Sequence, residues 1–213
     1  MSQIIRVFGP DGAGKSTIVP SLQEEFDATV INCSQPATWP DTAWHEASDG
    51  QFAPGSPEYH IETLRQCYGM VGNLATSGTA ETLVLDSDPQ LTIAAKAHVL
   101  AKHPSTLEDM FAMLGKVKDG CLSPEVAEAA VHVTVAGETA LRGQVLYDRI
   151  LKRGSVSRND PTDPEMASAL ASAYDSLETL LDSYQIPCTR VDTSVPRPVF
   201  RAKELSIRYG RRM

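Results

Sequence analysis

The sequence has few of the residues that cross-link small domains through disulfides or metal ions, and it lacks any long apolar run. Its four cysteines are far apart and form no Cys-x-x-Cys pair, and its five histidines show no metal-ligand spacing. We therefore expect buried, reduced thiols and no zinc site. The apolar runs have only strand length, and the one near the N-terminus is too short for a signal peptide. These absences favour a cytoplasmic protein that crosses no membrane.

Positive charge is scarce except at the C-terminus. Residues 197–213 carry six basic residues against Glu204, a net +5, so residues 1–196 carry −13 of the formal total of −8. This basic C-terminal segment is typical either of a polyanion-binding tail or of a solvated end that balances an acidic body. An acidic body offers a nucleic acid no long-range attraction.

Strand-length apolar runs alternate with longer segments of helical spacing. With 213 residues the chain is long enough for one domain with a full core. Alternating strands and helices predict an α/β fold with a parallel sheet and helices on both faces. The expected strands are 4–8, 28–33, 82–86, 130–135 and 186–191, and the expected helices are 15–26, 56–75, 90–102, 106–117, 138–153 and 163–184.

The stretch GPDGAGKST at residues 9–17 fits the pattern GxxxxGK[ST], with a predicted strand before it and a predicted helix after it. Its glycines allow backbone N–H groups to surround a phosphate, and the helix N-terminus adds partial positive charge. Lys15 is expected to reach the β- and γ-phosphates of ATP, and Ser16 to hold Mg²⁺. The predicted ATP site comprises Gly9, Asp11, Gly12, Ala13, Gly14, Lys15, Ser16 and Thr17.

A second cluster of cations lies in LYDRILKRGSVSRNDPTD, residues 146–163. Arg149 and Arg153 are one helical turn apart, and Arg158 lies just beyond Gly154. Cations beside a Gly- and Ser-containing segment suit phosphoryl transfer, because they bring positive charge to the transferring group. The alternative is an exposed basic helix end, which the helix dipole favours by itself. Downstream of a phosphate-binding loop we favour a lid over about 150–163.

The order of these features resembles thymidylate kinases and deoxynucleoside kinases, which are P-loop kinases. The resemblance covers about residues 1–195: GPDGAGKST, the carboxylate of Asp86, RILKRG, and IPCTRVDTS after the last helix. It implies a five-stranded parallel sheet, a lid, and transfer of the γ-phosphate of ATP to a nucleotide- or nucleoside-type acceptor, in a family where homodimers are common. It also implies that Asp11 contacts the acceptor and that Asp192 lies near the adenine.

Two positions depart from the family pattern. Gln35 precedes Pro36 where nucleoside kinases have a proton-accepting glutamate, and Ser87 follows Asp86 where both branches have an arginine. The missing arginine weighs against an ordinary nucleoside monophosphate acceptor. Asp86 is our first choice for a base or a magnesium contact. Asp88 and Asp11 are the alternatives, although Asp88 before Pro89 is equally typical of a helix N-cap.

Acceptor recognition is expected from the region 34–68. Trp39 and Trp44 lie in a polar, proline-rich stretch and are candidates to stack on a base, and Gln66 resembles a helix glutamine that pairs with its edge. Phe52, Tyr59 and Tyr68 are further stacking candidates, with core packing as the alternative for each. The predicted acceptor set is Asp11, Gln35, Trp39, Trp44 and Gln66.

Three functions fit these features. The first is a kinase for a free nucleotide or nucleoside. The second is a kinase of the same fold that phosphorylates the hydroxyl of a 5-hydroxymethyl pyrimidine within DNA, as in some bacterial viruses; Asp88 and the basic segment fit it. The third is a P-loop ATPase or a regulatory nucleotide-binding protein, against which the lid-like arginines argue.

Overall fold

Five short apolar runs form one parallel sheet in the computed structural model, which describes residues 2–33, 57–78, 80–100, 105–154 and 160–194. The strand order is β2-β3-β1-β4-β5, and every neighbouring pair is parallel. The predicted α/β fold is confirmed. The strands are β1 (Gln3–Phe8), β2 (Thr29–Asn32), β3 (Thr82–Asp86), β4 (Ala127–Thr134) and β5 (Cys188–Asp192).

The segments with helical spacing form the helices, each within a few residues of its predicted bounds. All six residues of β1 are buried, as a central parallel strand covered on both faces requires. The helices are α1 (Lys15–Phe26), α3 (Pro57–Thr76), α4 (Pro89–Val99), α5 (Leu107–Asp119), α6 (Thr139–Lys152) and α7 (Pro164–Ser183). No helix in the described part of the chain combines the length and apolarity that crossing a bilayer needs.

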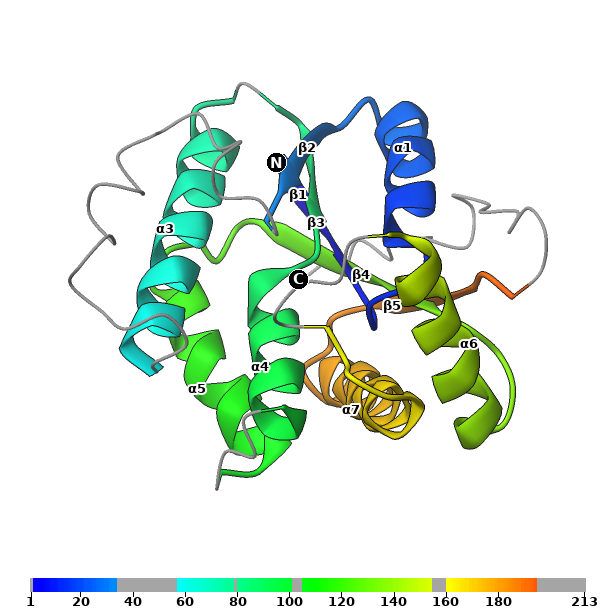
Figure 1. The fold of residues 1–213 in the computed structure, drawn as a ribbon. Coiled ribbons are helices and arrows are strands. Elements are labelled where there is room, and N and C mark those ends of the chain that lie inside the picture. The colour runs from blue at the N-terminus through cyan, green and yellow to red at the C-terminus, as the bar shows by residue number, and fades with distance from the viewer. Residues whose placement is uncertain (1, 34–56, 79, 101–104, 155–159, 195–213) are drawn as a thin grey trace.

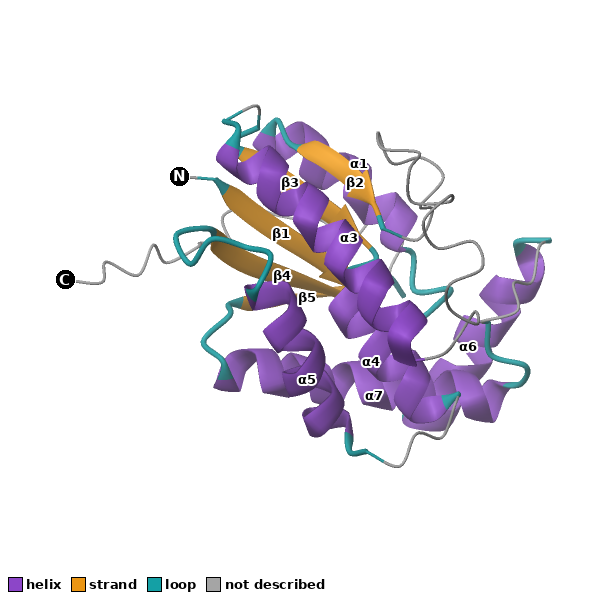
Figure 2. Ribbon diagram, turned by 90° about the vertical axis from the view of Figure 1, so that its left-hand side faces the viewer, coloured by secondary structure: helices purple, strands orange, loops and turns teal. Residues whose placement is uncertain are grey.

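Helices cover both faces of the sheet and enclose two apolar cores. α3, α4 and α5 lie on one side and α1 and α6 on the other (Figure 1, and turned in Figure 2). The first core includes the fully buried Leu64 and Tyr68, and the second includes Ile5 and Leu146. Among the cysteines, the predicted burial holds for Cys33 and Cys67, whereas Cys121 and Cys188 are half-buried; all four are free.

The carboxyl ends of β1 and β3 lie side by side at one edge of the sheet. Asn32 of β2 pairs with Asp86 of β3. The Cys33 N–H donates to the Asp86 carbonyl at 3.0 Å, a distance typical of a bond between strands. Ligands of open α/β sheets bind outside the carboxyl ends of the strands. This edge is therefore where the site is expected.

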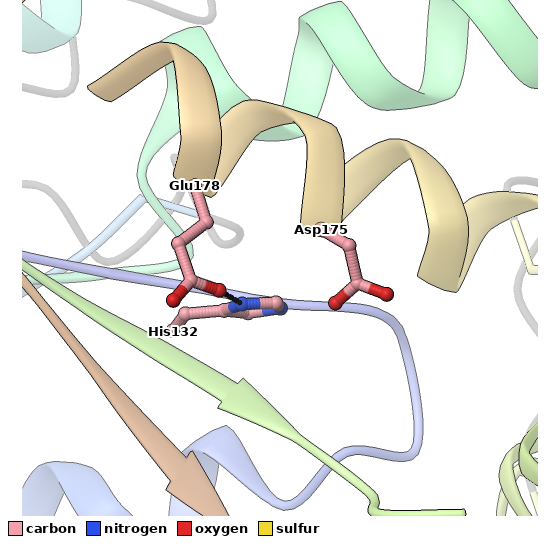
Figure 3. Close-up of side chains that lie close together, drawn as sticks. All are labelled: His132, Asp175 and Glu178. Carbon is pink, nitrogen blue, oxygen red and sulfur yellow. Dashed lines mark hydrogen bonds and ion pairs between the residues drawn. The ribbon is translucent and has the colours of Figure 1, made fainter. Parts of the chain in front are cut away.

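A charged network joins α7 to β4. Figure 3 shows His132 of β4 facing Asp175 and Glu178 of α7; its Nδ1 lies 2.6 Å from Glu178 Oε2. The three side chains have the donor types of a metal site. Arg190 pairs with both carboxylates, and Arg142 lies 2.7 Å from Asp175. Because guanidinium groups already neutralise these carboxylates, we interpret the cluster as an ion-pair network.

This network makes stability sensitive to acid. The hydrogen bond from His132 and the Arg190 guanidinium lower the pKa of Glu178 from 4.5 to about 2, against a smaller effect of burial. A lowered pKa in the folded state gives stability that is present above pH 4.5 and is lost as the pH falls towards 2. We expect Glu178→Gln to remove about 1 kcal/mol of stability at pH 6 and less at pH 3, because solvent screens this partly exposed group. Urea unfolding at both pH values measures this, with Glu165→Gln, exposed on the same helix, as control; equal losses at both pH values would contradict it.

Candidate functional site

The GPDGAGKST stretch forms the turn from β1 into α1. Gly9 has a φ of 144°, and a Cβ there would overlap the Val133 carbonyl oxygen of the neighbouring strand β4. Only glycine combines this left-handed backbone with so close an approach. The N-cap of α1 is Gly14, which provides no side-chain hydrogen bond to the first turn. No side-chain cap therefore competes with an anion for the N–H groups at the start of α1, as in a P-loop, although the Thr17 N–H donates to the Gly14 carbonyl at 3.0 Å.

The two side chains expected to hold phosphate and Mg²⁺ lie at the start of α1. The Lys15 ammonium lies across the loop and donates to the carbonyl oxygens of Gly9 at 2.8 Å and Pro10 at 3.1 Å. Ser16 is exposed. Burial lowers the pKa of Lys15, opposed by Asp11 and Asp86 and reinforced by Lys96 and Arg153. This donor set of N–H groups, an ammonium and a hydroxyl fits a magnesium-bound triphosphate.

Asp86 ends β3 beside this loop. Burial raises the pKa of its carboxyl group, while the Lys15 ammonium and a hydrogen bond from Ser87 lower it. Ser87 has a φ of 62°, and its hydroxyl donates to Asp86 Oδ1 at 3.3 Å. The structure therefore brings together Lys15 and Asp86, which are 71 positions apart in the sequence. A half-buried carboxylate here can accept a proton or contact a metal ion.

The P-loop acid Asp11 has a partner that the sequence did not indicate. Lys96 of α4 places its ammonium 2.8 Å from Asp11 Oδ2, with both side chains about one-fifth exposed, at 21% and 19%. Burial raises the pKa of Asp11, but Lys15, Lys96 and Arg153 together bring it below its ordinary value. Asp11 is therefore an ionised carboxylate surrounded by cations from α1, α4 and the end of α6.

Two of the arginines predicted for the lid, Arg149 and Arg153, lie next to the P-loop. Arg149 of α6 donates to the Gly12 carbonyl at 3.3 Å and to Thr193 Oγ1 and O, both at 3.0 Å. Arg153 pairs with the buried carboxylate of Asp160 at 2.7 Å. Arg158 lies outside the described residues, so the segment predicted as a lid is described only up to Gly154 and from Asp160 onward. Two of the three predicted cations are thus placed beside the loop.

The segment after β5 lies against the P-loop through Thr193 rather than through the predicted Asp192. Thr193 Oγ1 donates to the Ala13 carbonyl at 2.6 Å. The Asp192 carboxylate accepts hydrogen bonds from the backbone N–H groups of Ala136 and Ser194 at 2.9 and 2.8 Å. Asp192 therefore holds two loops together beside the P-loop, and Thr193 is the residue that sequence reasoning missed.

Asp88 is a buried structural carboxylate, and its N-cap interpretation is confirmed. Oδ1 accepts from the Leu91 N–H at 3.0 Å, and Oδ2 accepts from Tyr68 at 2.6 Å. The fully buried Arg6 of β1 binds both oxygens at 2.8 and 3.0 Å and also contacts Glu128. Because every oxygen is engaged and the side chain is fully buried, we do not carry Asp88 forward as a base or magnesium contact. Tyr68, a stacking candidate, belongs to the same network.

This network predicts a stability effect at Asp88. Asp88→Asn removes the charge that compensates Arg6 inside the core, where Glu128 remains as a partner. We expect the free energy of unfolding to fall by about 3 kcal/mol. Urea unfolding measures this change, and the exposed helix residue Asp182 changed to Asn serves as control. An Asp88→Asn variant that keeps its stability but loses turnover would restore the catalytic interpretation.

The acceptor residues are described only in part. Gln35, Trp39, Trp44 and Phe52 lie outside the described residues, and the side chain of Tyr59 is not described either. Gln66 of α3 donates from Nε2 to Glu62 at 3.0 Å, while its carbonyl oxygen is buried with no hydrogen-bond partner among the described residues. An unpartnered buried amide oxygen suits a hydrogen bond from a ligand.

Comparison with known proteins finds likeness in structure and not in sequence. No protein-family model matches the chain, and no curated protein sequence matches it. A deoxyadenosine kinase from M. mycoides, with dCMP and dCDP bound, matches with a TM-score of 0.57 and 16% identity over 91% of this chain and 92% of that one. The thymidylate kinase of Candida albicans matches with a TM-score of 0.58 and 14% identity over 91% and 85%. The chain has the P-loop kinase fold.

A sugar kinase from a Janibacter species shares this P-loop kinase fold with a TM-score of 0.50 and 17% identity, over 92% of this chain and 88% of that one. The same fold thus occurs in proteins named for nucleoside, nucleotide and sugar acceptors. A fold hosts many functions, so the acceptor has to be argued from the site.

Proposed function

We propose that the protein is an ATP- and Mg²⁺-dependent kinase that transfers the γ-phosphate of ATP to a nucleotide- or nucleoside-type acceptor. The observation that carries this proposal is the placement of Lys15, Ser16 and Asp86 around one P-loop. The M. mycoides deoxyadenosine kinase has been solved with dATP and with dCTP bound, which supports nucleotide use by this fold.

The P-loop would bind the donor through its backbone. The N–H groups at the start of α1 and the Lys15 ammonium are expected to hold the β- and γ-phosphates. Ser16, with Asp86 on the facing strand, would hold Mg²⁺, which neutralises phosphate charge when bound. Arg149, Thr193 and Asp192 lie on the side of the loop where we place the nucleoside part of ATP.

Transfer needs a proton acceptor and cations near the moving phosphoryl group. The acceptor oxygen forms a bond to the γ-phosphorus, the bond from that phosphorus to the β–γ bridging oxygen breaks, and ADP leaves. For a hydroxyl acceptor, its proton passes to Asp86, whose raised pKa suits this task. Lys15 and Arg153, with Arg158 as a further prediction, would stabilise the transferring group.

The acceptor would lie on the side of Asp11 and α3. Asp11 is at the P-loop, and Gln66 has an unpartnered amide oxygen. Trp39, Trp44 and Gln35 remain predicted acceptor contacts. Homodimer formation also remains a prediction.

The experiment that tests this function measures ATP consumption with Mg²⁺ against a panel of acceptors and records product masses. The panel comprises deoxynucleosides, deoxynucleoside monophosphates, and duplex DNA with and without hydroxymethylated pyrimidines. A mass gain of one phosphate on a free nucleotide or nucleoside supports the proposal. Transfer to DNA alone would replace it with the DNA-modifying alternative, and ATP hydrolysis without a phosphorylated product would replace it with an ATPase.

A further inference from the structure

Lys96 brings a cation to the P-loop from the helix that follows β3. It lies in the last turn of α4 and pairs with Asp11 at 2.8 Å. Arg149 and Arg153 approach the same loop from α6 instead. Because the Lys96–Asp11 pair is mostly buried, water screens it less than a surface ion pair.

The side of the P-loop next to β3 and β2 otherwise carries negative charge. Asp86 ends β3, and Ser87 follows it with its hydroxyl turned onto Asp86. The Cys33 N–H bonds to the Asp86 carbonyl, so the chain leaves β2 at this same edge. From Ser16 to Leu64 the sequence has no Lys or Arg at all, and it has eight acidic residues.

The cations that the described residues place at this edge already have partners. Lys96 pairs with Asp11, Arg153 with Asp160, and Arg149 with Thr193 and the Gly12 carbonyl. Lys15 is needed for the phosphates of ATP. Among the residues that the structure describes, each cation at this edge is already engaged, so a dianionic phosphate on the acceptor would meet the carboxylates of Asp11 and Asp86 with no further described cation to bind it.

We infer that Lys96 is a positioning residue that holds the Asp11 carboxylate ready for an uncharged acceptor. The acceptor is then a neutral nucleoside-type molecule that offers a hydroxyl group, and not a nucleoside monophosphate. This inference rests on the proposed kinase function. Asp11 accepts a hydrogen bond from a hydroxyl group of the acceptor, while Lys96 keeps that carboxylate ionised and fixed. The reacting hydroxyl forms its bond to the γ-phosphorus, ADP leaves, and the proton goes to Asp86.

The first test compares kcat/KM for each deoxynucleoside and its 5′-monophosphate, with Mg²⁺ and ATP at saturation. We expect the unphosphorylated acceptor to be preferred by at least about 100-fold, because a like charge placed beside the carboxylates of the site weakens binding strongly. Preference for a monophosphate would overturn the inference and leave the proposed kinase function in place. Transfer only to hydroxymethylated DNA would overturn both. Absence of transfer to every acceptor would overturn the proposed function itself.

The second test changes Lys96. Lys96→Met should raise the KM for the accepted nucleoside by about tenfold or more and leave the KM for ATP within about twofold, because only the acceptor side loses its orienting charge. Lys96→Arg should recover most of the loss. The control is Lys116→Met, an exposed lysine in the last turn of α5.

The pH profile separates positioning from a purely structural role. Asp11 faces Lys15 on α1, Lys96 on α4, Arg153 at the end of α6 and the Tyr174 phenol on α7. Loss of Lys96 removes one of the charges that lower the Asp11 pKa. The further fall of kcat/KM for the nucleoside that Asp11 adds below the limb set by Asp86 should therefore begin at higher pH. An unchanged limb and an unchanged KM for the nucleoside in Lys96→Met would overturn the role of Lys96.

Discussion

Lys15→Ala is expected to abolish phosphoryl transfer, with a loss of at least about 1,000-fold in kcat, while the protein remains folded. The ammonium is the charge that the P-loop directs at the β- and γ-phosphates, and alanine cannot replace it. Among the described residues, this group donates its hydrogen bonds to two carbonyl oxygens of the loop, those of Gly9 and Pro10. Its loss should therefore lower the free energy of unfolding by no more than about 3 kcal/mol.

Single-turnover transfer from labelled ATP measures the chemical step, and urea unfolding measures the stability. Lys116→Ala, an exposed helix position, is the matched control and should behave like the unmodified chain. Turnover that persists in folded Lys15→Ala would end the kinase proposal, since no other lysine occurs in the P-loop motif. If turnover is lost because the variant is unfolded, Lys15 is instead needed for the stability of the fold, through its hydrogen bonds to the loop carbonyls.

Local patterns were sufficient to predict the fold because each element satisfies its own physical requirement. The residues of the central strands β1 and β3 are consecutive and almost all buried. Helices such as α1 begin and end at their capping residues. Gly14 and Asp27 flank α1 in left-handed conformations, and Asp163 caps α7 through the Met166 N–H. Such signals lie within a few positions of one another in the sequence, so a single chain displays them.

The long-range pairs could not be predicted in this way. Asp88 was predicted both as a catalytic group and as an N-cap, and only the position of Arg6, 82 residues away, decides between them. Lys96 gave no signal, because an amphipathic helix often carries a lysine in its last turn. Thr193 carries no charge, so the charged Asp192 beside it is the more obvious candidate in the sequence. In each case the deciding partner comes from another strand or helix, and one sequence does not show which elements will meet.

Asp86→Asn is expected to lower kcat by about 100- to 10,000-fold while the affinity for ATP changes little. Asparagine has nearly the same shape but neither accepts a proton nor binds Mg²⁺ with a negative charge. The raised pKa of Asp86 comes first from burial, which outweighs Lys15 and the hydrogen bond from Ser87. Since the ionised carboxylate does the work, activity should fall as the pH drops through a value above 3.8, and this acidic limb should be lost in the variant.

Steady-state kinetics across pH, with Asp182→Asn as the exposed control, test this prediction, and a magnesium titration divides the two roles of the carboxylate. If Asp86 mainly holds Mg²⁺, the variant should need more Mg²⁺ and regain part of its turnover when it is supplied. If Asp86 mainly accepts the proton, added Mg²⁺ should leave the deficit unchanged, and the deficit should shrink for acceptors whose hydroxyl group is more acidic. Full turnover in Asp86→Asn would contradict both roles and would leave Asp11 as the one remaining carboxylate of the predicted set at the P-loop.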